Sequence, residues 1–282
     1  MEIAAPDFDL ALTLDSGQTF HWESLGKGFA GALDQRAVYL EQRGGALKFR
    51  GAPAKSVARY FSLDHPLAEI CESLPGDPAM QAAGEFCRGL RIMRQPRWEC
   101  LATFITSSMK QVVHIRQISR TLRERFGMRR SLGKIHVYSY PRPEVMADLH
   151  ETDLRHCALG YRAKNLLATA QLVASGKVDL EQLATLPDIE LRAALCALPG
   201  VGMKVANCVM LFAYERLEAF PIDVWVERVL RENYFPRRRK FRPNELQKFA
   251  ARHFGGHGGY AQQYLFHYAR KTTRRRLSPR GS

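Results

Sequence analysis

The two residues whose types could act together on a sugar are Lys204 and Asp223. Lys204 opens a run of apolar residues that predicts a buried helix, and a cation in the first turn of a helix is electrostatically misplaced. Partial desolvation and the positive end of the helix favour its neutral amine, which is the nucleophilic form. Asp223 lies in an apolar run, where a carboxylate can stabilise a developing oxocarbenium ion. The pair therefore indicates cleavage of a bond to a sugar carbon.

Each of the two residues also has a purely structural interpretation. Lys204 can lay its stem along apolar surface with the amine in water, and Asp223 can cap a helix over residues 224–234. Asp223 can serve both roles. Taken singly, each residue favours the structural interpretation; together, at this spacing, they favour chemistry.

A tight turn between two predicted helices positions Lys204. The first helical pattern has Asp188 as its predicted N-cap and ends at Pro199, and the second runs over residues 203–212. The glycines of the turn let its backbone N–H groups approach a phosphate closely. A helix pair with a glycine turn is common, so the turn alone also fits an ordinary connection. The predicted phosphate-binding residues are Gly200, Val201 and Gly202.

The composition indicates a polyanionic partner. The 282 residues include 42 Lys and Arg against 28 Asp and Glu, a net charge of +14, which favours nucleic acid first and an anionic membrane surface second. No apolar stretch is long enough to span a bilayer, and we expect a cytoplasmic protein, associated with the nucleoid if bacterial, without a membrane partner. The six cysteines contain no C-x-x-C pair, which indicates reduced, mostly buried thiols and no zinc site.

The elements that must hold this site divide the chain in two. Short, partly alternating segments at 10–14, 28–33, 37–41 and 46–50 predict strands, and a helical pattern follows at 54–63. From about Leu90 the pattern is helical to a basic C-terminal tail that contains Arg274, Arg275, Arg276 and Arg280. The sequence thus predicts an α+β fold, with an N-terminal antiparallel β-sheet domain over 1–90 and an all-α helix-hairpin-helix domain over 91–282.

The turn and the aspartate carry a family resemblance. Leu198-Pro199-Gly200-Val201-Gly202-Met203-Lys204, followed by Pro221-Ile222-Asp223, resembles the helix-hairpin-helix DNA glycosylases of the endonuclease III superfamily. Within it the chain is similar to 8-oxoguanine DNA glycosylase/AP lyases, and Trp225 is similar to the bacterial members. The resemblance implies that Lys204 forms a Schiff base with the sugar, that Asp223 stabilises the cationic sugar, and that the partner is double-stranded DNA with a damaged base, bound by a monomer.

The resemblance also implies a pocket for the flipped base. Residues 15–22 resemble the family's Ser-Gly-Gln-x-Phe-x-Trp segment, in which a glycine carbonyl accepts the ring N–H that only the oxidised guanine has. Taken singly, each position also fits an ordinary turn or a buried core residue. The implied pocket residues are Gly17, which reads the lesion, Cys208 and Phe266, which pack on the two faces of the ring, and Gln262, which reads its Watson–Crick edge.

A further set of residues is implied to contact the DNA around the flipped base. Phe104-Ile105-x-Ser107-Ser108 resembles the family's loop that fills the gap left by the flipped base. Gly160-Tyr161-Arg162-Ala163 matches a segment whose tyrosine and arginine lie at the orphaned base. The chain departs from the family at three positions: Met109 and Lys110 stand where the family has asparagines, and His114 where it has a cytosine-reading arginine. The resemblance therefore does not extend to the selection of cytosine. The implied DNA-contacting residues are Met109, Lys110, His114, Tyr161 and Arg162.

No cofactor is expected to be required. The four-cysteine iron–sulfur cluster of endonuclease III is not expected, because no cysteine follows Cys208. The resemblance implies a structural monovalent or divalent cation at the turn, held by the backbone carbonyls of Cys196, Leu198 and Val201.

These observations favour a bifunctional DNA glycosylase/AP lyase that excises 8-oxoguanine in base excision repair. One alternative is a glycosylase on the same scaffold for an oxidised pyrimidine or an alkylated purine, although Lys204 counts against the second. The other is a non-catalytic DNA-binding protein that uses the turn only to hold a phosphate.

Overall fold

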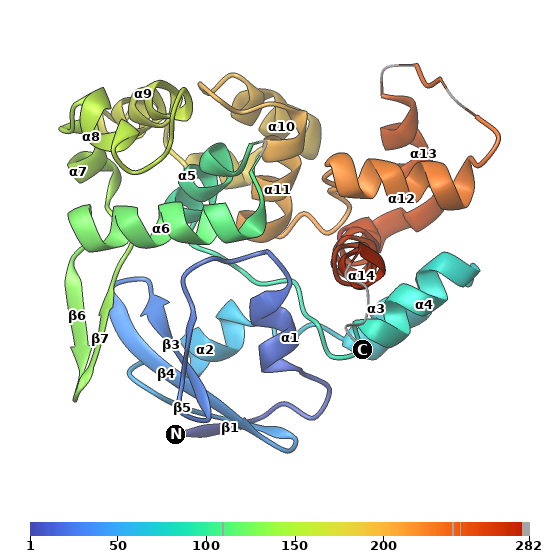
Figure 1. The fold of residues 1–282 in the computed structure, drawn as a ribbon, viewed down its shortest axis with the longest axis horizontal. Coiled ribbons are helices and arrows are strands. Elements are labelled where there is room, and N and C mark those ends of the chain that lie inside the picture. Colours follow the sequence, from blue (N-terminus) through green and yellow to red (C-terminus); the bar gives the residue numbers. More distant parts are fainter. Residues whose placement is uncertain (109, 239, 243, 278–282) are drawn as a thin grey trace.

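The N-terminal part is an antiparallel sheet that packs beside a larger helical body (Figure 1). The computed structural model describes residues 1–108, 110–238, 240–242 and 244–277, with side chains up to residue 272. The five strands lie in the order β1-β5-β4-β3-β2. They are β1 (Glu2–Ala4), β2 (Glu23–Leu25), β3 (Gly28–Leu33), β4 (Arg36–Arg43) and β5 (Ala46–Arg50).

The predicted strands at 28–33, 37–41 and 46–50 are confirmed. Leu40 pairs with Phe29 on one side and Phe49 on the other. The buried side chains of β4 and β5 pack against Val57 and Tyr60 of α2 (Ala54–Tyr60), so the sheet has its own core. Buried residues alternate with partly or fully exposed ones along β5, which is the period expected for a strand with one covered face.

The predicted strand at 10–14 is wrong, because these residues form helix α1 (Leu10–Asp15). Asp9 caps this helix, with its carboxylate accepting the Leu12 N–H at 2.8 Å. Leu10 and Leu14, one helical turn apart, then share the face that packs on the sheet core. The apparent alternation of apolar residues is therefore a coincidence within a capped helix.

Two further helices lie in the segment that the sequence predicts as strands and loops, α3 (Leu67–Glu72) and α4 (Pro78–Phe86). Their buried residues Ile70 and Met80 belong to the core of the helical body, whereas α1 and α2 belong to the core of the sheet. The first 90 residues thus contribute to both cores, and the domain division at residue 90 stays a prediction.

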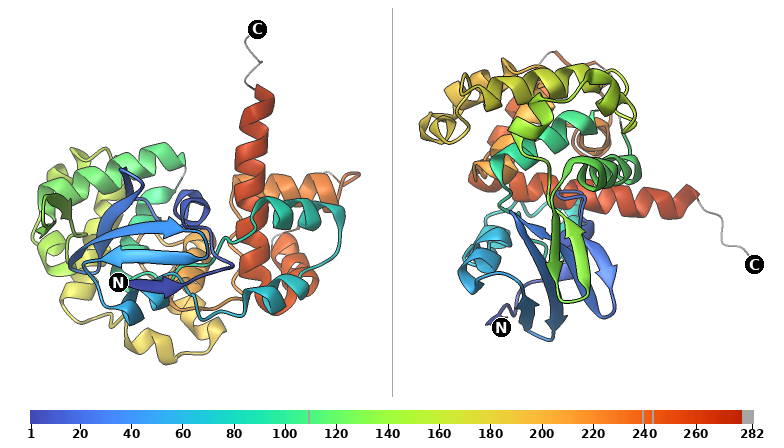
Figure 2. Two further views of the ribbon diagram at one scale, coloured as in Figure 1. Left: turned by 90° about the horizontal axis from the view of Figure 1, so that it is seen from below. Right: turned by 90° about the vertical axis from the view of Figure 1, so that its left-hand side faces the viewer.

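The remainder is mostly helical, and α11 lies inside it with every residue from Val205 to Ala213 buried. Helices α5 and α10 pack against α11, and α12 packs against α14, which extends away from the body in Figure 2. The helices are α5 (Arg97–Ser107), α6 (Val112–Phe126), α7 (Pro143–Ala147), α8 (Glu151–Arg155), α9 (Arg162–Ala174), α10 (Asp188–Cys196), α11 (Met203–Ala213), α12 (Val224–Tyr234), α13 (Glu245–Phe254) and α14 (Gly258–Leu277), with 3-10 turns at Gln182–Thr185 and Gly255–His257.

The helical prediction for this part needs two corrections. Strands β6 (Arg129–Leu132) and β7 (Ile135–Tyr138) form a hairpin around Gly133, which has a φ of +60°. Helix α14 continues to Leu277, so Arg274, Arg275 and Arg276 belong to a helix, while Arg280 lies outside the described residues. Among the helices of the described residues, none has the length and apolar character needed to cross a membrane.

Candidate active site

The turn between α10 and α11 has the predicted helix-hairpin-helix geometry. Gly200 has a φ of +80°, and a Cβ there would lie 2.8 Å from the Cβ of Asn165 on α9. The Pro199 carbonyl accepts a hydrogen bond from Thr169 Oγ1 at 3.0 Å, which fixes the turn against the same helix. Gly202 is the N-cap of α11, and a side chain there would enter open space. The first N–H groups of α11 therefore lie at an accessible, rigidly held helix end.

The side chain of Lys204 spans from the start of α11 to the end of α5. Its Nζ donates a hydrogen bond to Ser107 Oγ at 3.1 Å and lies 5.2 Å from the centroid of the Phe104 ring. Ser107 is the last residue of α5, and the carboxyl end of a helix carries partial negative charge. The partial negative charge at the end of α5 thus offsets the unfavourable interaction of the Lys204 cation with the positive start of α11.

Asp223 lies in the electrostatic field of the same lysine. It is the N-cap of α12, and Oδ1 accepts the Val226 N–H at 2.8 Å, so the predicted capping role is confirmed. Burial raises the pKa of the Asp223 carboxyl, while the Val226 N–H and the ammonium of Lys204 act to lower it. The structure therefore brings Lys204 and Asp223 into one site.

Cys208 belongs to this group as well. It lies one helical turn beyond Lys204 on α11 and is buried. Burial raises the pKa of its thiol to about 11, and Lys204 opposes that rise, so the thiol stays protonated at neutral pH. A protonated thiol is a small apolar surface beside the amine.

The other implied pocket residues meet where the loop after α1 approaches α14. Gly17 has a φ of +90°, and a Cβ there would lie 3.1 Å from Cε1 of Phe266. Gln262, one turn earlier on α14, is only 5% exposed, and its Oε1 has no hydrogen-bond partner among the residues that the structure describes. A buried amide oxygen without a partner is costly, and a ligand that donated to it would supply the missing hydrogen bond.

Hydrogen bonds from distant segments hold the loop of Gly17 in place. Gln18 receives the Met93 N–H on Oε1 at 2.8 Å and donates to the Arg91 carbonyl at 2.9 Å. Gln263 of α14 donates to the Ser16 carbonyl at 2.8 Å. The ring of Phe20 lies 6.1 Å from that of Phe104, the ring beneath Lys204. The loop thus connects the pocket residues Gly17, Gln262 and Phe266 (the Gly17 group) to Lys204.

The implied DNA-contacting residues differ in exposure, and their contacts with DNA stay predictions. His114 and Tyr161 are exposed, Lys110 is half-buried, and Met109 lies outside the described residues. Phe104 to Ser107 form the last turn of α5 and not a loop, so the gap-filling segment can begin only after Ser107.

Arg162 is buried in this structure, and its implied contact with the orphaned base stays a prediction. It is 6% exposed, and its guanidinium donates to the Ser108 carbonyl through Nε at 2.8 Å and to the Leu159 carbonyl at 3.3 Å. The ring of Tyr161 lies 4.3 Å from its guanidinium carbon. In this structure the guanidinium supports the segment after α5 and the Tyr161 ring rather than facing solvent.

The implied cation site is not tested by this arrangement and stays a prediction. The Leu198 carbonyl already accepts the Val201 N–H at 3.1 Å, which leaves one of its lone pairs for a cation.

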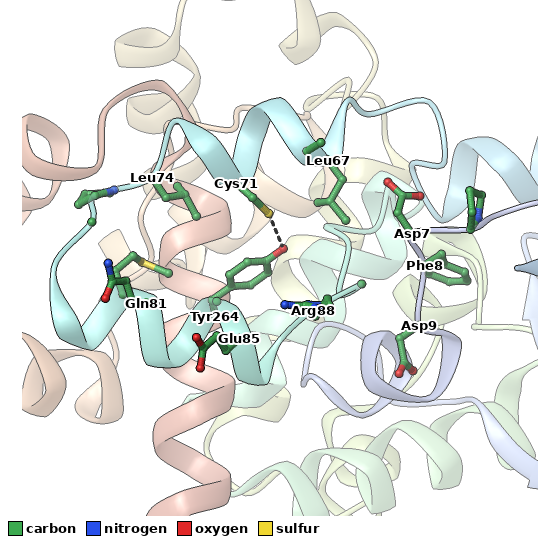
Figure 3. Close-up of a pocket in the computed structure, with 17 residues that line it drawn as sticks. Asp7, Phe8, Asp9, Leu67, Cys71, Leu74, Gln81, Glu85, Arg88 and Tyr264 are labelled. Atoms are coloured by element: carbon green, nitrogen blue, oxygen red, sulfur yellow. Dashed lines mark hydrogen bonds between the residues drawn. The ribbon is translucent and has the colours of Figure 1, made fainter. Parts of the chain in front are cut away.

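Two grooves lie away from the lysine. One, of about 960 Å³, lies between the N-terminal segment, α3 and α4, and includes Asp9, Glu85 and Arg88 on its walls (Figure 3). Its Tyr264 lies on the opposite face of α14 from Gln262 and Phe266, since alternate residues on a helix point about 200° apart. The second, of about 730 Å³, lies between Trp22, α6 and the β6–β7 hairpin. Of the implied site residues that the structure describes, none lines either groove.

Ser107 and Phe104 are the site residues that sequence reasoning missed as partners of Lys204. Their segment resembles a loop in the family, and the one available signal was the helical spacing of apolar residues that continues to Ser107. A contact between residues so distant in the chain has no local sequence pattern.

The chain is similar to known base excision DNA repair proteins over most of its length. Residues 1–101 match the family model of the 8-oxoguanine DNA glycosylase N-terminal domain, and residues 102–252 match that of the HhH-GPD superfamily base excision DNA repair proteins. The chain is 28% identical to a probable N-glycosylase/DNA lyase of Methanothermobacter thermautotrophicus, over 96% of each chain.

Two solved structures are similar over nearly their whole length. MBOgg1 in complex with a low affinity DNA ligand has a TM-score of 0.91 at 33% identity, covering 96% of each chain. The Clostridium acetobutylicum 8-oxoguanine glycosylase/lyase, bound to duplex DNA with cytosine opposite the lesion, has a TM-score of 0.90 at 28% identity, covering 97% of this chain and 98% of that one.

Proposed function

Because the chain belongs to the HhH-GPD superfamily of base excision DNA repair proteins, we propose that it is a bifunctional N-glycosylase/DNA lyase that removes 8-oxoguanine from double-stranded DNA. The observation that carries this proposal is that Lys204 and Asp223 interact electrostatically beside the turn between α10 and α11. A DNA-binding hairpin alone requires neither a lysine amine nor a buried carboxylate at this position.

The mechanism starts with the damaged nucleotide flipped out of the duplex. The neutral amine of Lys204 attacks the anomeric carbon, and the electron pair of the glycosidic bond leaves with the base, which takes up a proton. The carboxylate of Asp223 stabilises the positive charge that develops on the sugar. Loss of a proton from nitrogen and opening of the sugar ring give a Schiff base. Loss of a C2′ proton then expels the 3′ phosphate by β-elimination.

Recognition of the lesion is assigned to the Gly17 group. The Gly17 carbonyl accepts the N–H that 8-oxoguanine has and guanine lacks; guanine would place a lone pair against this oxygen. The unpaired Oε1 of Gln262 accepts from the Watson–Crick edge, and Phe266 stacks on the ring. Cys208 is assigned to the other face of the base. The protein acts as a monomer in the cytoplasm, bound through the N-terminus of α11 to a phosphate.

The test uses duplexes that carry 8-oxoguanine, thymine glycol, 3-methyladenine or no lesion, each reacted in the presence of borohydride. The proposal expects a covalent protein–DNA adduct and strand cleavage with 8-oxoguanine above all, and no adduct with Lys204→Gln. Preferred reaction with another lesion supports the alternative substrate. Binding of every duplex without an adduct supports the non-catalytic alternative.

A further inference from the structure

We propose that Ser107 is a positioning residue that orients the Lys204 amine for attack, an inference that rests on the function proposed above. Ser107 is 5% exposed and lies on α5, far in sequence from the hairpin. Its Oγ lies 3.1 Å from Nζ of Lys204 and 2.7 Å from the carbonyl oxygen of Phe104. The hydroxyl therefore lies between the amine and the backbone at the end of α5.

The bond to the Phe104 carbonyl determines how Ser107 meets the lysine. A serine hydroxyl has one hydrogen, and here it is donated to the carbonyl three residues earlier in the helix. Toward Lys204 the oxygen can then only accept. A neutral amine that donates one hydrogen to Ser107 must direct its other hydrogen and its lone pair away from α5. Ser107 thus sets the direction of the lone pair that forms the new bond to carbon.

Ser107 is one of several groups around Nζ. The centroid of the Phe104 ring lies 5.2 Å from Nζ, and the titratable groups that act on or beside it are Cys208 on α11, Cys100 on α5 and Asp223 before α12. Removal of the hydroxyl therefore leaves the amine beside the same groups but less well oriented.

Thr106 offers a matched control on the same turn of α5. It is 1% exposed, and its Oγ1 donates to the Thr103 carbonyl at 2.7 Å, a bond of the same kind as that of Ser107. Thr106→Val removes this bond with little change of volume. If Ser107 only stabilised the end of α5, Ser107→Ala and Thr106→Val would have similar effects.

The experiment measures single-turnover excision of 8-oxoguanine by the full chain across pH, together with thermal unfolding and duplex affinity. We expect Ser107→Ala to lower the plateau rate about tenfold, as loss of one oriented hydrogen bond at the nucleophile implies. Thr106→Val is expected to leave the rate unchanged, and both variants should bind the duplex as the wild type does.

Ser107→Cys serves as a second variant of nearly equal size, in which the weak acceptor sulfur should produce the same loss of rate. The proposal is overturned if Ser107→Ala keeps the wild-type plateau rate, or if it and Thr106→Val lose rate equally. Lys204→Gln separates this result from the underlying function. If that variant is still trapped on DNA, the proposed nucleophile itself is wrong, whatever Ser107 does.

Discussion

Replacement of Asp223 by asparagine separates its two roles, the helix cap and the catalytic charge. In the wild type, Oδ1 of Asp223 lies 2.8 Å from the Val226 nitrogen and accepts its N–H. The amide oxygen of the introduced asparagine can accept the same N–H, and asparagine caps helices about as well as aspartate. The side chains are nearly equal in size. Asp223→Asn therefore removes the negative charge and leaves the start of α12 in place.

The expected effect on stability follows from the direction of the pKa shift. Because burial raises the pKa of Asp223 above its ordinary 3.8, ionisation of the carboxyl disfavours the folded state. This penalty is absent below the pKa of Asp223 in the unfolded state. It develops as pH rises toward the higher pKa of the folded state, and it is fully present above that pKa. Asp223→Asn should thus match the wild type near pH 3 and have an equal or higher melting temperature at pH 7. Asp223→Ala, which also loses the cap, should be destabilised by about 1 kcal/mol.

The expected effect on catalysis is large. Loss of one preorganised electrostatic group at a developing charge typically lowers the rate by about 10²–10³, or roughly 3–4 kcal/mol. Single-turnover excision from an 8-oxoguanine duplex at pH 7 measures this loss, and unfolding of the same preparations measures stability. Full excision by a well-folded Asp223→Asn would refute the electrostatic role. A variant that is slow only because it is unfolded would refute the separation of cap from charge.

Three further predictions concern the pocket, the hairpin and pH. Gly17→Ala should lower 8-oxoguanine excision at least tenfold, with less effect on the binding of undamaged duplex; paired excision and binding assays measure this. The reason is that the φ of +90° at this position costs an alanine about 1–2 kcal/mol and that its Cβ would press on Phe266. Gly200→Ala should lower both the melting temperature and the affinity for any duplex, since its Cβ would meet Asn165 at 2.8 Å; an unchanged affinity would contradict the phosphate-binding role of the turn. Excision should decline in acid at a pH above 3.8, because Asp223 has a raised pKa and its protonated form carries no stabilising charge; a pH–rate profile that stays flat down to pH 4 would contradict this.

The parts of the site that depend on short-range pattern could be predicted from the sequence. The glycines before Lys204 and the apolar run after it specify a turn and a buried helix, and both are present. Asp223 could be recognised as a cap from the helical pattern that follows it. The strands at 28–33 and 46–50 follow from alternation between glycine turns.

Secondary structure could not be predicted from the sequence where tertiary contacts or a single capping residue determine it. The alternation in residues 10–14 predicts a strand, but the Asp9 cap and contacts with the sheet core produce a helix. Other contacts have no local sequence signal at all: the Arg162 guanidinium donates to the Ser108 carbonyl at the end of another helix, while its implied DNA contact stays a prediction. The same holds for the bond between Ser107 and Lys204, which exists only because α5 packs on α11.

The central claim is that the amine of Lys204 forms the covalent bond to the sugar. The most direct measurement is digestion of the borohydride-trapped adduct, followed by mass spectrometry to identify the lysine that carries the DNA remnant. The account predicts that the modified residue is Lys204. Modification of another lysine, such as Lys110 or Lys164, with Lys204 recovered intact would contradict it.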